Sequence, residues 1–236
     1  EWNKNKKKYI AKGNAKARKA DLLVTSNVLE AIYEDNNDTE SEITVLKAKG
    51  NVFIKNQKAQ IQGGKKARYN LKKEYFIVNG KKLELISNED RLTSNSTIEF
   101  WKNENIAIAT GKAKAHKNNK YSIFADKLVW HLIDDKEIGN KEKEGQGYQI
   151  KRILAYKNVI IETNNEIAYS DKALYNELSG ICKLFGEVKL KKGDNFLTGE
   201  YAEMNLNTGI SKLLPHPTKK TSETENRVKA LIKKNE

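Results

Sequence analysis

The chain has 236 residues, of which 38% are hydrophobic and 32% are charged, and its formal net charge is +13. This thin apolar content suits elements that bury one face only, and no apolar run approaches the roughly 20 residues of a membrane span. The positive charge favours anionic partners, namely nucleic acid, lipid headgroups or phosphorylated glycolipids, although most lysines are expected to be the solvated faces of strands.

Alternation of apolar and polar residues with period two runs through the chain to about residue 214 and predicts strands with one buried face. Apolar pairs that show it, in chain order, are Val52 with Ile54, Leu83 with Leu85, Ile98 with Phe100 and Val159 with Ile161. Turns are predicted where Gly, Asn and Asp gather, at Gly63-Gly64, Asn79-Gly80 and Gly193-Asp194-Asn195. The sequence therefore predicts an almost wholly β protein.

The sequence repeats on two scales. The long repeat has a period of roughly 105 residues: IAKGNAKARK (10–19) returns as IATGKAKAHK (108–117), EITVLKAKGNVFI (42–54) as QIKRILAYKNVII (149–161), and KKARYN (65–70) as DKALYN (171–176). The short repeat is a glycine or its equivalent, a strand, a bend and a strand that ends in a large residue. It starts at Gly13, Gly50, Gly111, Lys157 and Gly186. Stacked strand pairs of this kind predict a β-solenoid, roll or propeller.

The long repeat divides the chain into an N-terminal extension (1–8), a first β unit (9–107), a second β unit (108–214) and a basic flexible tail (215–236). The polar stretches EDNNDTESE (34–42) and DDKEIGNKEKEGQGYQ (134–149) fall at matching places of the two units and are predicted to be solvent loops. The tail from Pro215 is predicted to be flexible or weakly helical.

A search for catalytic residues is negative. His116, His131 and His216 lie in unlike contexts, and the sequence predicts no metal site, no cofactor and no enzyme activity. The lone Cys182 allows no internal disulfide and is predicted to be a buried, inert thiol. Asp126 and Asp171 occupy matching positions and are interpreted as hydrogen-bond partners at strand ends.

The segment AYSDKALYNELSGICKLFGEVKLKKGDNFLTGEYAEMNLNTGISKLLP (168–215) resembles the OstA-like/LptA family, the periplasmic bridge of lipopolysaccharide export in Gram-negative bacteria. The resemblance rests on the succession G-x-V-x-L, G-D-N, L-T-G-x-x-A-x-M-N-L and N-x-T-G, and the internal repeat extends it over residues 9–214. It implies an all-β, elongated, open and twisted β-jellyroll, here as two tandem units, in the periplasm after removal of any signal peptide.

The resemblance also implies a function. Acyl chains of lipopolysaccharide would lie in an apolar groove between the sheets and pass from the inner to the outer membrane. Inner-membrane LptC-like and outer-membrane LptD-like jellyrolls would bind by edge-strand pairing, at the first strands (9–33) and the last (196–214), and end-to-end self-association is open. No nucleic-acid partner is expected, because the aromatic residues alternate in phase with the aliphatic ones.

Apolar residues on the predicted buried face are the candidates for the groove lining, and ordinary core packing is an equally good interpretation of each. They are Val52, Ile54, Ile61, Tyr69, Ile98, Phe100, Phe124, Leu128, Trp130, Val159, Ile161, Ile167, Tyr175, Val188, Leu190 and Met204. Lysines near strand ends are candidates for lipid A phosphate contacts, although plain solvation is the favoured interpretation. They are Lys112, Lys114, Lys189, Lys191 and Lys192.

Two alternatives remain at this point. The chain could be the jellyroll of another export component, either LptC-like or the N-terminal domain of the translocon. It could also be a basic β-repeat that acts as an adhesin or binds polyanions.

Overall fold

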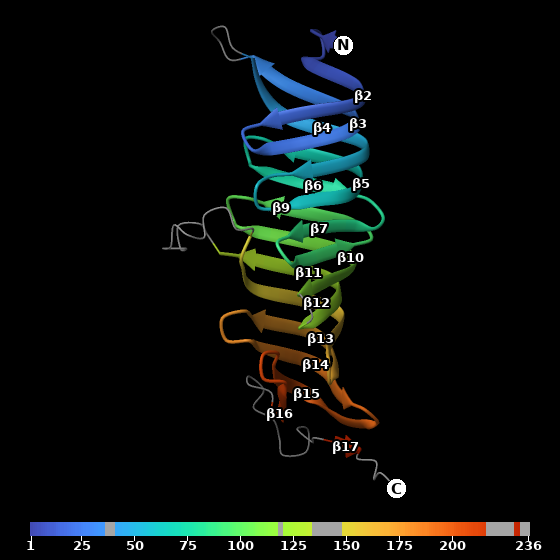
Figure 1. Ribbon diagram of the computed structural model, residues 1–236, viewed down its shortest axis with the longest axis vertical. Helices are drawn as coiled ribbons and strands as arrows, with labels where there is room; N and C mark the ends of the chain where they lie inside the picture. Colours follow the sequence, from blue (N-terminus) through green and yellow to red (C-terminus); the bar gives the residue numbers. More distant parts are fainter. Residues whose placement is uncertain (36–40, 118–119, 134–147, 216–228, 232–236) are drawn as a thin grey trace. The chain divides into compact units, whose positions relative to one another are not determined.

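The computed structural model describes residues 1–35, 41–117, 120–133, 148–215 and 229–231 (Figure 1). Antiparallel strands make up most of these residues, which confirms the all-β prediction. Within these ranges no helix is long and apolar enough to cross a membrane. The chain divides into two compact units, one made of Glu1–Thr110 with Leu132–Gln149 and the other of Gly111–His131 with Ile150–Glu236.

The first unit is a succession of strands that pair mostly with their neighbours in the chain. Its strands are β1 (Trp2–Asn3), β2 (Lys8–Lys19), β3 (Leu22–Asp35), β4 (Ser41–Lys55), β5 (Gln60–Asn70), β6 (Tyr75–Asn79), β7 (Leu83–Ser87), β8 (Asp90–Ser94), β9 (Thr97–Trp101) and the first part of β10 (Ile106–Lys117). Strands β2 to β5 pair in order, β5 then pairs with both β6 and β7, and β9 pairs with β6 and β10.

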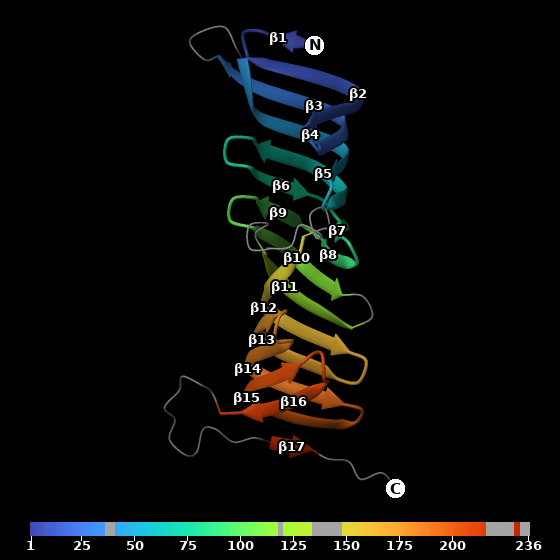
Figure 2. The same cartoon turned by 60° about the vertical axis from the view of Figure 1, so that its left-hand side comes forward.

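The second unit follows the same scheme. It holds the rest of β10, most of β11 (Tyr121–Leu132), and β12 (Ile150–Thr163), β13 (Ile167–Asn176), β14 (Ile181–Lys192), β15 (Asn195–Asn205), β16 (Ile210–Leu214) and β17 (Lys229–Leu231). Strands β12 to β16 pair antiparallel in chain order, and Figure 2 shows this succession from another side.

Two predicted segments have different boundaries in the structure. Lys229–Leu231 of the predicted flexible or weakly helical tail form strand β17, which pairs with the first residues of β15; the rest of the tail after Pro215, His216 included, lies outside the described residues. In the predicted loop 34–42, β3 extends through Asp35 and β4 begins at Ser41. Residues 36–40 of that loop and 134–147 of the second loop also lie outside the described residues.

Five long strands bend at two consecutive residues with positive φ, between +42° and +94°. We call each a corner pair. They are Gly13-Asn14, Gly50-Asn51, Gly111-Lys112, Lys157-Asn158 and Gly186-Glu187. These are the starts of the short sequence repeat. Glycine is favoured at the first position because it adopts positive φ without a steric cost.

An Asn or Asp of the neighbouring strand lies beside three of the corner pairs. Asn51 donates a hydrogen bond from Nδ2 to Oδ1 of Asn27 at 3.2 Å, and Asn158 donates one to Oδ2 of Asp126 at 2.9 Å. Asp171 lies so close to Gly186 that a Cβ there would be 2.3 Å from its Oδ2. Asp126 is thus confirmed as a hydrogen-bond partner, although it lies within a strand and not at its end.

Two predicted lining residues are only partly buried. Phe124 of β11 lies between the buried Ile123 and Ala125, and Ile167 of β13 precedes the buried Ala168. The buried positions shift by one residue within each of these strands, so simple alternation does not extend along their whole length. A role of Phe124 or Ile167 in lining a groove stays a prediction.

Candidate functional site

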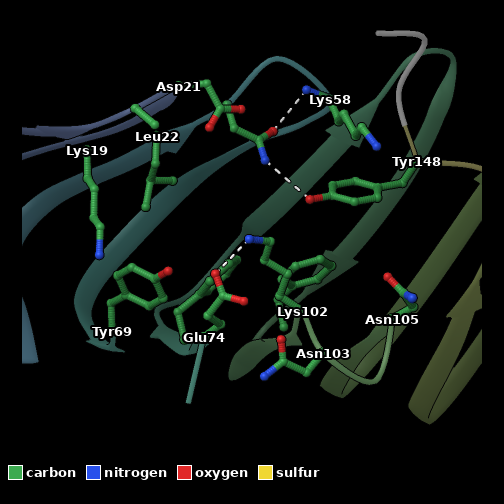
Figure 3. A pocket seen from close by; sticks show the side chains of 14 residues that line it. Lys19, Asp21, Leu22, Lys58, Tyr69, Glu74, Lys102, Asn103, Asn105 and Tyr148 are labelled. Atoms are coloured by element: carbon green, nitrogen blue, oxygen red, sulfur yellow. Dashed lines mark hydrogen bonds and ion pairs between the residues drawn. The ribbon is translucent and has the colours of Figure 1, made fainter. Parts of the chain in front are cut away.

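The first unit contains a cavity of about 630 Å³ (Figure 3). Its lining residues come from the ends of β2 to β5, from β6 and β9 with the turns beside them, and from Tyr148. They are Lys19, Ala20, Asp21, Leu22, Asn56, Lys58, Tyr69, Glu74, Phe76, Phe100, Lys102, Asn103, Asn105 and Tyr148. The cavity thus combines large apolar side chains with several cations.

Four aromatic rings form one wall of this cavity, and we call them the aromatic row. Strand register places Tyr69 of β5 opposite Phe76 of β6, and Phe76 opposite Phe100 of β9. The ring centroids are 6.3 Å apart for Tyr69 and Phe76, 5.3 Å for Phe76 and Phe100, and 5.1 Å for Phe100 and Tyr148. Three neighbouring strands and the segment before β12 therefore build a continuous apolar surface.

Two further cavities adjoin the first, because they share lining residues with it. A small apolar pocket of about 30 Å³ shares Leu22, Phe76 and Phe100 and continues to Ile54, Ile61 and Leu85. A cavity of about 380 Å³ shares Lys19, Leu22 and Tyr69 and adds apolar residues of β2, β3 and β4. These are Ala17, Val24, Ala31, Ile43 and Leu46, together with Leu71. We call the three cavities together the groove.

Charged and polar side chains occupy the rim of the groove. Lys102 donates to Oε1 of Glu74 at 2.6 Å, and this hydrogen bond raises the pKa of Lys102. Lys19 reaches into the cavity from the end of β2 (Figure 3) and has no ion-pair partner within the described part of the chain. The rim can therefore attract an anionic group while the wall accepts an apolar one.

Tyr148 is the groove residue that was least predictable from the sequence. It belongs to the stretch 134–149, predicted to be a solvent loop, yet its ring lies against Phe100. Its backbone N–H donates to Oγ of Ser87 at 2.7 Å, and its hydroxyl accepts a hydrogen bond from Nδ2 of Asn56 at 3.2 Å. The one feature of the sequence that could have indicated its place in the groove is that a large aromatic residue stands at the end of an otherwise polar stretch.

Apart from Phe124 and Ile167, the predicted lining residues fall into three groups. Tyr69, Phe100, Ile54 and Ile61 line the groove. Val52 and Ile98 are buried in the first unit. Eight others are buried in the interior of the second unit: Leu128, Trp130, Val159, Ile161, Tyr175, Val188, Leu190 and Met204. A role of any of them in holding a lipid stays a prediction.

The predicted phosphate-contacting lysines all belong to strands of the second unit, and they do not line the groove of the first. Nζ of Lys114 lies 4.8 Å from the ring centroid of Phe124, and Nζ of Lys189 lies 4.5 Å from that of Phe196. Lys112, Lys191 and Lys192 are exposed. The cations at the groove are instead Arg18, Lys19, Lys58 and Lys102, which come from turns and strand ends of the first unit. Strand alternation gives no information about such positions.

The cysteine and the two described histidines lie outside the groove. Cys182 is fully buried, and burial raises the pKa of its thiol, as expected for an unreactive cysteine. Nδ1 of His116 lies 3.0 Å from Oγ of Ser122, and burial lowers the pKa of His131. Among the described residues, no group of His, Cys, Asp and Glu is arranged to hold a metal ion. The arrangement can bind an amphipathic molecule with apolar chains and an anionic head.

Comparison with known proteins identifies a family, and the chain is similar to solved structures. The model of the family described as LptA/(LptD N-terminal domain) LPS transport protein matches residues 93–210, which is half of the chain. Among solved structures, the chain is similar to LptH of Pseudomonas aeruginosa, described as the LptA-homologous periplasmic component of its lipopolysaccharide transport device. The identity is 13%, the match covers 75% of this chain and 95% of that one, and the TM-score of 0.33 is too low to carry an argument. No curated protein matches the chain.

Proposed function

Because this chain belongs to the LptA/LptD N-terminal-domain family of lipopolysaccharide transport proteins, we propose that its groove holds the acyl chains of lipopolysaccharide during passage between the inner and outer membranes. The chain is accordingly a periplasmic component of lipopolysaccharide transport and not an enzyme. Our proposal concerns the binding of acyl chains in the groove and the role of the chain as a bridge between the membranes.

The observation that carries the proposal is the apolar wall of the groove beneath a basic rim. The aromatic row and its aliphatic neighbours offer a surface on which acyl chains can leave water, and each buried methylene contributes about 0.8 kcal/mol. The rim cations Lys19, Lys58 and Lys102 can face the phosphates of lipid A, whose sugars carry the acyl chains. Because the wall is apolar and has no strong polar anchor, a bound chain can slide along it.

Photo-crosslinking in living cells tests the proposal. A photoreactive amino acid at Tyr69 or Phe76 should give lipopolysaccharide adducts, because both side chains line the groove. Leu178 is the matched control, because it is an apolar residue that is 96% exposed in a turn of the second unit. Adducts at Leu178 as strong as those at Tyr69 and Phe76 would contradict a groove-bound acyl chain.

We propose further that partner jellyrolls, or another copy of the chain, pair with β2 and β16. On one side β2 pairs with β3, and on the other the segment Glu1–Asn3 pairs only with Lys8–Ile10. β16 pairs with β15, and the described residues place no other strand against it. Exposed backbone groups on an edge strand can pair with a strand from another molecule.

Cysteine crosslinking tests these edges without interference from the buried Cys182. Cysteines introduced at the exposed positions Lys16 of β2 and Lys212 of β16 should form disulfides between molecules or with cysteines in partner strands. A cysteine at Lys66, which is exposed but lies in β5 between two paired strands, is the control. Crosslinks at Lys66 alone would contradict edge pairing.

A further inference from the structure

The first twelve residues form a hairpin of β1 and β2 with an unusual composition, and we call it the N-terminal hairpin. It contains five lysines and a single carboxylate, Glu1. It also holds two of the most exposed large side chains of the described residues, Trp2 at 60% and Tyr9 at 43% exposure. Neither the groove nor the strand pairing of the units explains why these rings remain in contact with solvent.

The two exposed rings are held in place. Register puts Trp2 opposite Tyr9, and their rings stack with centroids 6.1 Å apart and an interplanar angle of 17°. Nε1 of Trp2 donates to the hydroxyl of the buried Tyr33 at 3.0 Å, and the Tyr9 ring lies 5.1 Å from that of Tyr33. The rings therefore form a fixed, outward-facing aromatic patch, and little conformational entropy remains to be lost on binding.

The lysines beside this patch are only partly neutralised. Lys7 pairs with Asp35 at 2.9 Å, Lys8 with Glu30 at 2.9 Å and Lys12 with Glu1 at 3.4 Å. Another carboxylate nearby, Glu34, pairs with Lys72. Lys4 and Lys6 are exposed, and within the described ranges neither has an ion-pair partner.

The turn that carries these two free lysines is ordered by its own hydrogen bonds. The N–H of Lys6 donates to Oδ1 of Asn3 at 3.0 Å, and the N–H of Lys7 donates to the carbonyl of Lys4 at 3.1 Å. The N–H of Tyr33 in turn donates to the carbonyl of Lys7 at 3.0 Å, which fastens the turn to β3. Two ammonium groups that form no ion pair with any described residue are thus presented next to the aromatic patch.

We propose that the N-terminal hairpin binds the surface of an anionic lipid bilayer, with Trp2 and Tyr9 at the headgroup level and Lys4 and Lys6 on lipid phosphates. Trp and Tyr concentrate at membrane interfaces, because each combines an apolar ring with a polar tip. A lysine near an anionic surface adds about 1 kcal/mol of attraction. This contact is separate from the groove, because it needs a bilayer and not a single lipopolysaccharide molecule.

Flotation with vesicles that lack lipopolysaccharide tests the contact. The full chain should float with vesicles containing phosphatidylglycerol and much less with pure phosphatidylcholine. Lys4→Glu with Lys6→Glu should lower the partition coefficient at least about tenfold, since two attractions of about 1 kcal/mol are lost. Lys65→Glu with Lys66→Glu changes the net charge equally at exposed positions of β5 and should have a much smaller effect.

A second pair of variants tests the aromatic patch. Trp2→Ala with Tyr9→Ala should also reduce flotation, whereas Leu178→Ala, which removes another exposed apolar side chain, should not. Circular dichroism checks that each variant is folded. In addition, brominated lipids should quench the fluorescence of the wild type, and Trp2→Phe should abolish most of that quenching, because Trp130 is buried and the partly exposed Trp101 lies on β9, outside the hairpin.

Three results would overturn the proposal. Partitioning to vesicles could fall as much in the Lys65/Lys66 variant as in the Lys4/Lys6 variant, which would assign binding to the net charge of the protein. The wild type could bind neutral vesicles equally well, or it could bind no vesicles, which would leave the hairpin as a surface for a protein partner. Lipopolysaccharide crosslinking at Tyr69 should persist in the hairpin variants. The groove and the hairpin can therefore fail independently.

Discussion

The corner pairs show how single residues determine the path of each long strand. Two consecutive residues with positive φ turn the chain within a strand, and four of the five pairs begin with glycine. Lys157 is the exception, with φ of +62°. A side chain in this region costs about 1 kcal/mol, so the second unit tolerates at the first position of one corner pair a strain that glycine avoids at the first position of the other four.

Two corner glycines form a matched pair for a stability measurement. At Gly13 an added Cβ meets no atom within 4 Å, whereas at Gly186 it would lie 2.3 Å from Oδ2 of Asp171. Gly13→Ala should therefore lower the free energy of unfolding by about 1 kcal/mol through backbone strain alone. Gly186→Ala should lower it by about 2–3 kcal/mol, because Asp171 must also move.

Urea unfolding of the two variants, followed by circular dichroism, measures the difference. Replacing Asp171 by alanine in the Gly186→Ala background should recover the steric part of the loss. Equal losses at Gly13 and Gly186, with no recovery, would mean that Asp171 does not restrict this corner.

At the scale of elements, a polar and aromatic cluster joins three strands of the second unit. The hydroxyl of Tyr121 at the start of β11 donates to Oε2 of Glu177 at 3.2 Å, and Lys117 of β10 pairs with the same carboxylate. The Tyr121 ring lies 5.0 Å from that of Tyr175 in β13. Burial is the main cause that raises the pKa of both tyrosines.

These raised pKa values predict a loss of stability in alkaline solution. The unfolded chain releases the phenolic protons near pH 10, while the folded chain retains them. The free energy of unfolding should therefore be unaffected by these groups below about pH 10 and fall as the pH rises above it. Tyr121→Phe with Tyr175→Phe should flatten this fall.

Urea unfolding at a series of alkaline pH values, together with the tyrosinate absorbance, tests this expectation. The absorbance of Tyr121 and Tyr175 should appear only with loss of structure. Reversible ionisation of every tyrosine near pH 10 in the folded protein would contradict it.

The sequence predicted the kind of element well and the facing of some residues poorly. Alternation at Val52 and Ile54, or at Val188 and Leu190, gave buried positions correctly, because no bend interrupts those pairs. Phe124 is only partly buried, because the buried positions of β11 shift by one residue between Ala125 and Leu128, and such a shift is set by pairing between strands. The same limit applies to Ile167.

The groove was predictable only in part for a similar reason. Tyr69 and Phe100 followed from their place in alternating strands. Phe76 becomes part of the aromatic row through its register with both of them, and register is a property of pairing and not of a single strand. Tyr148 joins the row from outside any strand, where periodicity carries no information.

For the whole molecule, the net charge of +13 and the apolar groove should affect different steps of lipopolysaccharide binding. Long-range attraction speeds encounter and is screened by salt, whereas buried apolar contact slows release and is not. Raising the salt concentration from about 0.05 to 0.5 M, which shortens the Debye length to a few ångströms, should lower the association rate several-fold.

Stopped-flow fluorescence with labelled lipopolysaccharide separates the two rates. The dissociation rate should change little with salt, and Tyr69→Ala with Phe76→Ala should raise it. If salt raised the dissociation rate as much as it lowered the association rate, ionic contacts and not the groove would hold the ligand.

The pairing of strands with their chain neighbours has a consequence for how each unit folds. Hairpins such as β12–β13 and β13–β14 close short loops, so the contact order of these parts is low for a β protein. Folding can therefore begin at any hairpin and continue by the addition of neighbouring strands. Local unfolding should begin at the edge strands and proceed toward the central strands. Amide hydrogens of β13 and β14, each held between two strands, should exchange last, and those of β16 should exchange early.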